Sequence, residues 1–442
     1  MKESGRGRFQ KIQSVLYFAA EIETTNYGEM EMEEMLLERF LRYVRIWSTS
    51  DSASADGGVQ PSTARQFDFA NLLADEMKKI GLSDVAVTEQ CYVYGKLPAT
   101  SGMEDAEPVA LLAHIDTVEE VSGENVKPIV HASFSGGKIE LPSGVVLDPA
   151  SDSALFEAGK NGETVITSDG STLLGADDKA GVAEIMCAVE KVIAGGLPHG
   201  VIEVVFSPDE ETGHGMDNVP LGLIASKKAY TVDGGHVGEL ETECFNAYKS
   251  DITFTGRSMH TGSARPGMVN ALTMASSFVT SLPRNEAPET TDGKMGFFAP
   301  MSIEGTIESA HVCVFLRDFE KEGIERRKNV VEALASAAAL SFGGKAEVVH
   351  TFQYANMKEG LDKNPPVVDS LVAAYKKAGV EPVFVPIRGG TDGSRLTEMG
   401  IPTPNMFTGG HNYHSRTEWA SLEQMEKAVL VLVNLVSDAE RK

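Results

Sequence analysis

Three short runs of mostly apolar residues constrain the fold of this sequence more than any other feature. They cover residues 109–113, 202–206 and 229–232, and each is long enough for one strand. Runs of this kind are typical of parallel strands that are buried on both faces, because helices pack on each side of such a sheet. The sequence therefore predicts an α/β protein with a mixed, mostly parallel sheet at its centre.

Apolar residues recur at helical spacing in segments around these runs, at 36–47, 69–80 and 180–194. The helix predicted at 180–194 ends at Gly195 and Gly196 and connects the first two strands. A last helix is predicted to begin at Ser421, where Gln424 completes the spacing of a capping box. This alternation of strands and helices indicates a sheet that is covered on both faces.

A different order of elements occupies the middle of the chain. The patterns predict strands at 251–255, 301–306, 311–318 and 346–352, and helices at 268–282 and 323–340. This βαββαβ order is that of a ferredoxin-like domain. We therefore expect one domain formed by residues 35–246 and 354–442, with an α+β domain of residues 247–353 inserted into it. Residues 1–34 are rich in glutamate and are predicted to form a poorly ordered or peripheral leader.

The charge of the chain excludes several classes of function. Among its 442 residues, 39 Lys and Arg are opposed by 64 Asp and Glu, which gives a formal charge of −25. This charge repels phosphate backbones and anionic lipids, so we expect neither nucleic acid nor a membrane as a partner. No apolar run in the sequence approaches the roughly 18 residues that a membrane span needs. The four cysteines form no CxxC pair, which predicts reduced thiols in a cytoplasmic protein.

Histidine and acidic residues stand where the predicted strands end. His114 and Asp116 follow the first run. Glu210 and Glu211 follow the second run, and Asp233 follows the third. Each group alone has an ordinary explanation, since polar residues often cap strand ends. Together they lie at the carboxyl ends of parallel strands, which is where open α/β sheets place their sites.

Two further groups of candidate ligands lie elsewhere in the chain. Asp177 and Asp178 are adjacent in a Gly-bounded turn before a helix, where a cation would offset their repulsion. His411 and His414 lie near the C-terminus, and the residues alone do not decide which aspartate or which histidine would be the ligand. One such histidine and one such aspartate, added to the strand-end residues, would complete two metal positions with nitrogen and oxygen ligands. That donor set favours Zn²⁺, or Mn²⁺ or Co²⁺, and leaves Glu210 free to act as a base.

Six motifs, in this order, resemble those of the M20 metallopeptidase family. They are AHIDT (113–117), LLGADDKAGVAEIM (173–186), FSPDEETG (206–213), YTVDGG (230–235), IRGGTDG (387–393) and FTGGHNYH (407–414). The resemblance extends from about residue 36 to the C-terminus. It implies a zinc-peptidase domain of the α/β class with an inserted ferredoxin-like lid domain.

The resemblance also implies a ligand set for two Zn²⁺ ions, with Co²⁺ or Mn²⁺ as substitutes. His114 and Asp233 would hold one ion, Glu211 and His414 would hold the other, and Asp177 would bridge them. The family pattern D-x-K favours Asp177 over Asp178, and a histidine four residues before a glutamate favours His414 over His411.

Further roles follow from the same resemblance. Asp116 would orient His114, and Glu210 would be the general base. In the inserted domain, His260 matches a residue that polarises the scissile carbonyl, and Arg317 matches one that meets the carboxylate of the substrate. Arg388 resembles a second anion-binding residue.

The function implied is that of an aminopeptidase that releases the N-terminal residue of tripeptides. Three alternatives stay open. One is a dipeptidase or an N-acyl-amino-acid amidohydrolase of the same family, and another is a non-catalytic binding protein that kept the fold. A metal-dependent phosphoesterase would need more basic residues and has no motif in its favour. The expected partner is a short peptide substrate, and the resemblance is compatible with a homodimer.

Overall fold

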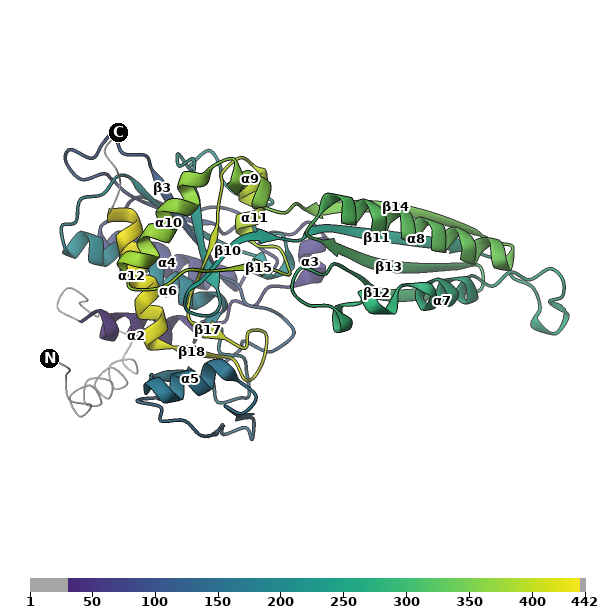
Figure 1. The fold of residues 1–442 in the computed structure, drawn as a ribbon, viewed down its shortest axis with the longest axis horizontal. Helices are drawn as coiled ribbons and strands as arrows, with labels where there is room; N and C mark the ends of the chain where they lie inside the picture. Colours follow the sequence, from purple (N-terminus) through teal and green to yellow (C-terminus); the bar gives the residue numbers. More distant parts are fainter. Residues whose placement is uncertain (1–30, 438–442) are drawn as a thin grey trace. The chain divides into compact units, whose positions relative to one another are not determined.

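The computed structural model describes residues 31–437, which form two compact units (Figure 1). The first unit contains the described residues up to Thr242, together with Gly360–Val385 and the residues from Thr391 onward. The second contains Glu243–Glu359 and the short segment Pro386–Gly390. Of the expected leader, residues 1–30 lie outside the described residues, and helix α2 (Met32–Tyr43) begins within its last residues.

The first unit is built on an eight-stranded sheet with the order β1-β2-β8-β3-β9-β16-β10-β15. Four neighbouring strands, β8, β3, β9 and β16, pair in parallel, whereas β1, β2 and β10 make antiparallel pairs. The prediction of a mixed, mostly parallel sheet is therefore confirmed. The strands are β1 (Ser83–Val87), β2 (Val93–Leu97), β3 (Val109–His114), β8 (Ile202–Ser207), β9 (Ala229–Gly234), β10 (Glu239–Cys244), β15 (Val383–Ile387) and β16 (Asn405–Phe407).

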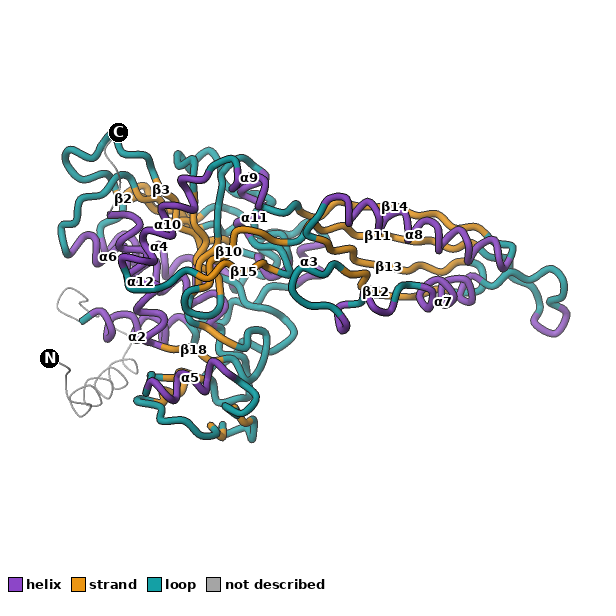
Figure 2. The backbone as a smooth tube through the Cα atoms, in the orientation of Figure 1, coloured by secondary structure: helices purple, strands orange, loops and turns teal. Residues whose placement is uncertain are grey.

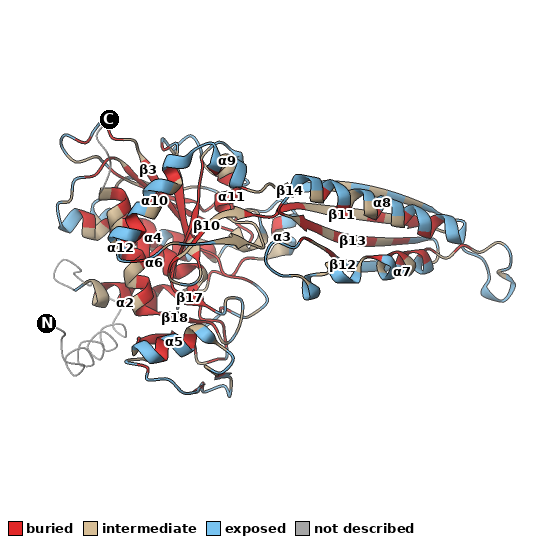
Figure 3. Cartoon of the chain, viewed as in Figure 1, coloured by how far each residue is buried: buried red, intermediate tan, exposed pale blue. Residues whose placement is uncertain are grey.

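Both faces of the parallel strands are covered. Leu111 and Val204 face the main core, which they share with α2, α4 (Gln66–Ile80), α6 (Ala176–Ala194), α10 (Pro365–Lys377) and α12 (Leu422–Ser437). Leu112 and Val205 face the other side, where they pack with Leu396 of α11 (Asp392–Glu398). Neither face meets water, which explains why these strands are apolar along most of their length. Figure 3 shows this burial on the central strands and on α6.

Shorter elements complete the first unit. A four-stranded sheet has the order β17-β18-β7-β4, and β5 pairs with β6. These strands contain only two or three residues each, too few to show a periodicity in the sequence. The elements are β4 (Ile129–His131), β5 (Ile139–Glu140), β6 (Val146–Leu147), β7 (Val165–Thr167), β17 (Gly410–His411), β18 (Trp419–Ser421), α3 (Ser52–Asp56), α5 (Ser153–Asn161) and the 3₁₀ helix η2 (Glu210–Thr212). Helix α9 (Lys358–Asp362) contains the boundary between the units at Glu359 and Gly360.

The second unit contains an antiparallel sheet with the order β12-β13-β11-β14. Helices α7 and α8 pack against this sheet (Figure 2) and against each other. The core that they share with the sheet includes Phe254, Phe278 and Val331. The predicted βαββαβ order is confirmed. The elements are β11 (Asn246–Thr255), α7 (Ala271–Ser281), β12 (Phe297–Gly305), β13 (Ser309–Asp318), α8 (Lys321–Phe342) and β14 (Lys345–Tyr354), with 3₁₀ helices η3 (Thr261–Ser263), η4 (Arg284–Glu286) and η5 (Pro288–Thr290).

Two further expectations, on membrane-spanning helices and on the cysteines, concern residues 31–437. None of the helices in this range is long and apolar enough to cross a membrane. The four cysteines, which all lie within the described residues, form no disulfide there, and Cys91, Cys187 and Cys244 are buried.

Helix α6 approaches β9 closely at Gly181. A Cβ atom at this position would overlap the carbonyl oxygen of Val232 and would lie 2.5 Å from Oδ1 of Asp178. No other residue fits without moving the helix. Glycine here therefore allows the first turn of α6, which carries Asp177, to lie next to the end of β9, which carries Asp233.

We expect Gly181→Ala to destabilise the first unit by about 1–3 kcal/mol or more, because overpacking in a tight interface forces the backbone apart. Urea unfolding measures the change. Gly222→Ala is the matched control, since a Cβ there meets no atom within 4 Å. Equal stability of the two variants would contradict this account of the α6–β9 contact.

Candidate metal centre

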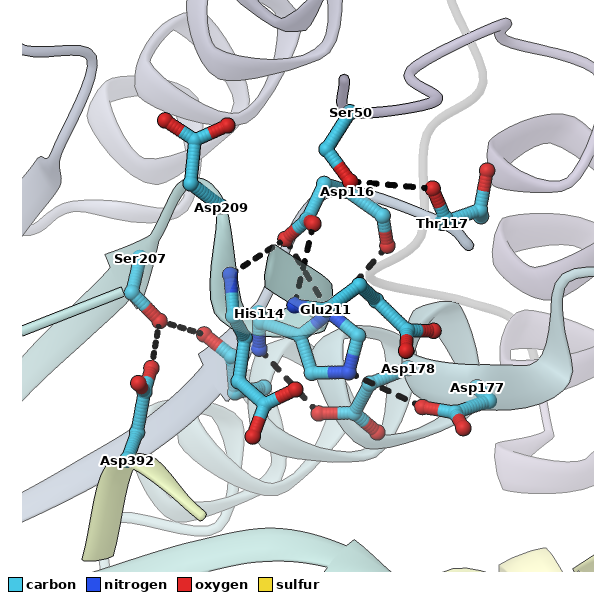
Figure 4. Close-up of polar contacts among 12 residues, drawn as sticks. Ser50, His114, Asp116, Thr117, Asp177, Asp178, Ser207, Asp209, Glu211 and Asp392 are labelled. Carbon is cyan, nitrogen blue, oxygen red and sulfur yellow. Dashed lines mark hydrogen bonds and ion pairs between the residues drawn. The ribbon is translucent and has the colours of Figure 1, made fainter. Parts of the chain in front are cut away.

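His114, at the end of β3, lies at the middle of a cluster of carboxylates (Figure 4). Its Nε2 is 2.9 Å from Oδ1 of Asp177 and 3.6 Å from Oδ1 of Asp233. Its Nδ1 lies 3.1 Å from the backbone carbonyl oxygen of Asp116 and 3.3 Å from the carboxylate of the same residue. The ring is therefore held from one side and presents Nε2 to two carboxylates.

His414 reaches the same cluster from the loop between β17 and β18. Its Nε2 lies 3.2 Å from Oδ2 of Asp177 and 3.0 Å from Oε2 of Glu211. The two oxygens of Asp177 thus face two different histidines, His114 through Oδ1 and His414 through Oδ2. This is the arrangement expected of a carboxylate that bridges two cations.

Glu210 and Glu211 lie on η2, immediately after β8. The Asp116 carboxylate accepts hydrogen bonds from both of their backbone N–H groups, at 3.0 and 3.2 Å. On the other side of the loop, the Asp209 carboxylate accepts from the Ser62 backbone N–H at 2.8 Å and from Gln66 of α4 at 2.6 Å. Asp116, which was expected to orient His114, therefore also holds the backbone of both glutamates. The sequence did not indicate this second contact.

The two ligand choices that the residues left open have different surroundings in the structure. Asp178 accepts hydrogen bonds from the backbone N–H groups of His114 at 3.1 Å and Gly181 at 3.2 Å, so its oxygens point at the backbone. His411 is buried, stacks on Trp419 with ring centroids 4.0 Å apart, and contacts Gln424 through Nε2 at 3.1 Å. Asp177 and His414, by contrast, face the cluster.

Packing so many acids together shifts their pKa values. Burial raises the pKa of Glu210 well above its usual value and that of Glu211 to about 8, with neighbouring carboxylates adding to both shifts. Hydrogen bonds to Asp177 and Glu211 raise the pKa of His414 to about 11. Burial also raises the pKa of Asp233. Without a cation, the cluster therefore holds protons that the same groups would release in water.

The donor set fits divalent cations. His114, Asp177 and Glu211 each offer one ligand atom, and these atoms lie within 4.8 Å of one another; so do atoms of His114, Glu210 and Asp233. Among the described residues, the buried Oε1 of Glu211 has no hydrogen-bond partner. Nitrogen and oxygen donors without thiolate suit zinc and harder divalent ions.

Several residues that support the cluster were given no role in it from the sequence, although Glu418 is the glutamate of the pattern that selects His414. Ser207, at the end of β8, donates to the buried carboxylate of Asp392 at the start of α11. Asn405 of β16 accepts from the Asp233 backbone N–H at 3.1 Å. Glu418 accepts from three backbone N–H groups before and within α6. Asp392 lies in the IRGGTDG motif and could have been suspected, whereas no local pattern marks Asn405.

The three residues expected to contact substrate all belong to the second unit. His260 is exposed and precedes η3 in the loop between β11 and α7. Arg317 of β13 is buried, and its Nη1 donates to Gln353 at 2.9 Å and to the Tyr248 carbonyl at 3.3 Å. Arg388 donates to the Gly293 and Met295 carbonyls and to Thr291, so both of its terminal nitrogens already have partners.

Within the second unit, His260 and the two arginines lie towards opposite ends of the sheet. Arg317 pairs with Ala247 at the start of β11, and Arg388 lies over the rings of Phe245 and Phe297, at the same end of the sheet. His260 follows the other end of β11, in a loop that extends beyond the sheet (Figure 1). The nine residues from Ala247 to Thr255 are joined by eight strand steps, which span about 26 Å.

Comparisons with known proteins identify the family of this chain. Residues 168–438 match the family model described as peptidase family M20/M25/M40. The chain belongs to this family.

Within this family, the relatives compared with the chain include proteins named Peptidase T. The chain is 42% identical to Peptidase T of Clostridium perfringens over 401 residues, which are 90% of this chain and 97% of the relative. It is 42% identical to Peptidase T of Geobacillus thermodenitrificans over 93% of this chain and 100% of the relative. In fold it resembles the crystal structure of aminopeptidase PepT from Bacillus cereus, with a TM-score of 0.72 and 22% identity over 93% of this chain and 100% of that one.

We expect zinc to stabilise the metal-free protein, because a cation that binds the folded cluster shifts the unfolding equilibrium. At a free concentration of 100 Kd the gain is about 2.7 kcal/mol per site. Thermal unfolding after chelation, with and without added Zn²⁺, measures it. His414→Ala should lose part of the gain, while His131→Ala, a residue of β4, should keep all of it. No stabilisation of the wild-type protein would contradict the assignment.

Proposed function

We propose that this protein is a tripeptide aminopeptidase that holds two Zn²⁺ ions, with Co²⁺ or Mn²⁺ as substitutes. Relatives at 42% identity carry the name Peptidase T, and similar folds include a tripeptidase from Staphylococcus aureus. Cysteines without disulfides among the described residues support a reducing, cytoplasmic location. Peptide substrates follow from the family, whereas substrate length and the number and identity of the ions belong to the proposal.

One observation carries the metal part of the proposal: Asp177 lies between two histidines, with one oxygen facing each. In the proposal, His114 and Asp233 hold one cation, Glu211 and His414 hold the other, and Asp177 is shared. Bound cations would act as Lewis acids at the scissile carbonyl and would lower the pKa of a water molecule towards neutrality.

The residues of the chain supply proton transfer and orientation. Glu210 takes a proton from the attacking water and later gives it to the leaving amine, a role that suits a buried carboxylate with a raised pKa. Asp116 fixes the backbone of Glu210 and Glu211 and faces Nδ1 of His114, so one side chain aligns the base with two ligands.

The ends of a tripeptide are both charged. The proposal directs the α-ammonium group to the acidic cluster and the carboxylate to Arg317 and Arg388. The terminal nitrogens of Arg388 already donate to residues 291–295 of the second unit. Arg388 would therefore bind the carboxylate through N–H groups that are not used in these bonds, or after residues 291–295 move away. Arg317 is partly engaged by Gln353 in the same way.

The position of His260 supports a homodimer. A tripeptide is about 10 Å long, much shorter than the strand that separates His260 from Arg317. One peptide therefore cannot contact both residues of the same unit in this structure. In the proposal, His260 of a second copy of the chain meets the carbonyl of a peptide whose carboxylate is bound by Arg317 and Arg388.

We expect Glu210→Gln to lower kcat by about 10²–10⁴-fold, because general-base catalysis contributes that range. The isosteric amide removes the proton acceptor and keeps the shape of the loop. Steady-state turnover of Ala-Ala-Ala measures the loss, and metal content per chain should stay near that of the wild type. Exposed Glu120→Gln is the control. Nearly unchanged turnover of Glu210→Gln would show that another group is the base.

The substrate class can be tested with Ala-Ala-Ala, Ala-Ala and N-acetyl-alanine side by side. Hydrogen bonds to a charged group contribute about 1.5–3 kcal/mol, so loss of the α-ammonium charge should lower kcat/KM by about tenfold to a hundredfold. The dipeptide should also be poorer, because the proposed activity is release of the N-terminal residue of a tripeptide. Preference for Ala-Ala would favour a dipeptidase, and preference for N-acetyl-alanine would favour an amidohydrolase.

The homodimer can be tested by mixing two inactive variants, His260→Ala and Glu210→Gln. If each site takes Glu210 from one copy and His260 from the other, a hybrid dimer contains one intact site. Co-expression should therefore restore part of the wild-type activity, whereas co-expression of Glu210→Gln with a chain that carries both Glu210→Gln and His260→Ala should restore none, because neither chain supplies Glu210. Failure of the first pair to recover activity, or a monomer in sedimentation, would exclude this arrangement.

A further inference from the structure

Glu418 makes an unusual set of contacts with the backbone before α6. Its carboxylate is 1% exposed. One oxygen, Oε2, accepts from the N–H groups of Leu174 at 2.7 Å and Gly175 at 2.8 Å. The other, Oε1, accepts from the N–H of Asp177 at 3.1 Å. A single side chain thus binds three donors that lie 241–244 residues away in the sequence.

These three donors belong to the start of α6, where the chain departs from helical geometry. Gly175 has φ of 81°, and Asp177 has φ of −81° and ψ of 105°. N–H groups in the first turn of a helix have no carbonyl partner within it, and a negative charge is favourable at that end. Glu418 therefore supplies hydrogen-bond acceptors to residues 174–177, whose N–H groups would have no acceptor within a regular helix.

Glu418 also belongs to the loop of His414. It lies four residues after His414, and its own N–H donates to the Ser415 carbonyl at 3.3 Å. His414 contacts the side chain of Asp177 through Nε2, at 3.2 Å. The same loop thus holds Asp177 twice, at the backbone through Glu418 and at the carboxylate through His414.

We propose that Glu418 is a positioning residue of the metal centre, which sets the orientation of Asp177 by joining residues 174–177 to the loop that carries His414. This inference rests on the metal ligands of the proposed function, but it does not depend on the identity of the substrate. Glu418 touches neither substrate nor cation in this proposal and acts through Asp177 alone.

Glu418→Gln tests the proposal with a side chain of the same size. The amide keeps one acceptor oxygen and turns its NH₂ group towards at least one of the three N–H donors, which then loses its partner. Mutations of groups that orient metal ligands typically weaken metal binding or activity by about 10–100-fold. Calorimetric titration of the metal-free variant with Zn²⁺ should show such a loss for at least one ion. With Ala-Ala-Ala, kcat should fall about tenfold or more while KM changes little.

Glu203→Gln is the matched control, because it tests whether loss of any buried carboxylate has the same effect. Glu203 is 1% exposed and accepts from the backbone N–H groups of Ala225 and Ser226, at 3.0 and 2.8 Å. It lies on β8, four residues before Ser207 at the strand end. This variant should lower the melting temperature and keep the zinc affinity and kcat of the wild type.

Two results would overturn the proposal: a Glu418→Gln protein that is less stable but binds zinc and turns over like the wild type, or equal loss of zinc affinity in both variants. If Glu418→Gln does not fold, Glu418→Asp takes its place with the same expectations, since it keeps the charge but withdraws the oxygens. Wild-type protein that binds zinc without cleaving tripeptides would refute the proposed function only. Wild-type protein that binds no zinc would refute both.

Discussion

Repulsion among buried carboxylates is the constraint on which the rest of this structure depends. Asp116, Asp177, Glu210, Glu211 and Asp233 converge near the ends of three strands. Burial there raises the pKa of Glu210, Glu211 and Asp233. Acids in this arrangement stay charged only when positive charge is close. Two histidines supply part of that charge, and the geometry of Asp177 provides for cations to supply the remainder.

The fold meets this constraint with fixed backbone. Parallel strands buried on both faces end at one edge, which brings His114, Ser207 and Asp233 together although they are distant in sequence. Gly181 allows α6 to lie against β9, and Asp116 holds the loop of both glutamates. Rigid elements therefore carry most of the candidate ligands, as a site with fixed distances requires. Only His414 comes from a long loop, and Glu418 of the same loop ties it to α6.

Much of the fold could be predicted from local patterns. The runs at 109–113, 202–206 and 229–232 correspond to β3, β8 and β9, and the βαββαβ order of the middle region is confirmed. The strands β4, β7, β17 and β18 were not predicted, because two or three residues carry no periodicity. Their pairing depends on contacts between distant segments, such as β7 with β18.

The candidate site was predicted unevenly for a similar reason. Ligand-type residues at strand ends are visible in the sequence, so His114 and Asp233 could be found one motif at a time. Asp116 was expected to orient His114, but the contacts of Glu418 and Asn405 could not be predicted, since these residues act on backbone N–H groups far away in the chain. The partners of Arg388 are also invisible in the sequence, and they show an arginine that is already engaged in this structure.

The most direct test of this account is a crystal structure of the zinc-loaded protein, with anomalous scattering measured on both sides of the zinc edge. We predict two zinc peaks in each chain, one beside His114 and Asp233 and one beside Glu211 and His414, with Asp177 bound to both. A single peak, or two peaks that do not share Asp177, would contradict the central claim.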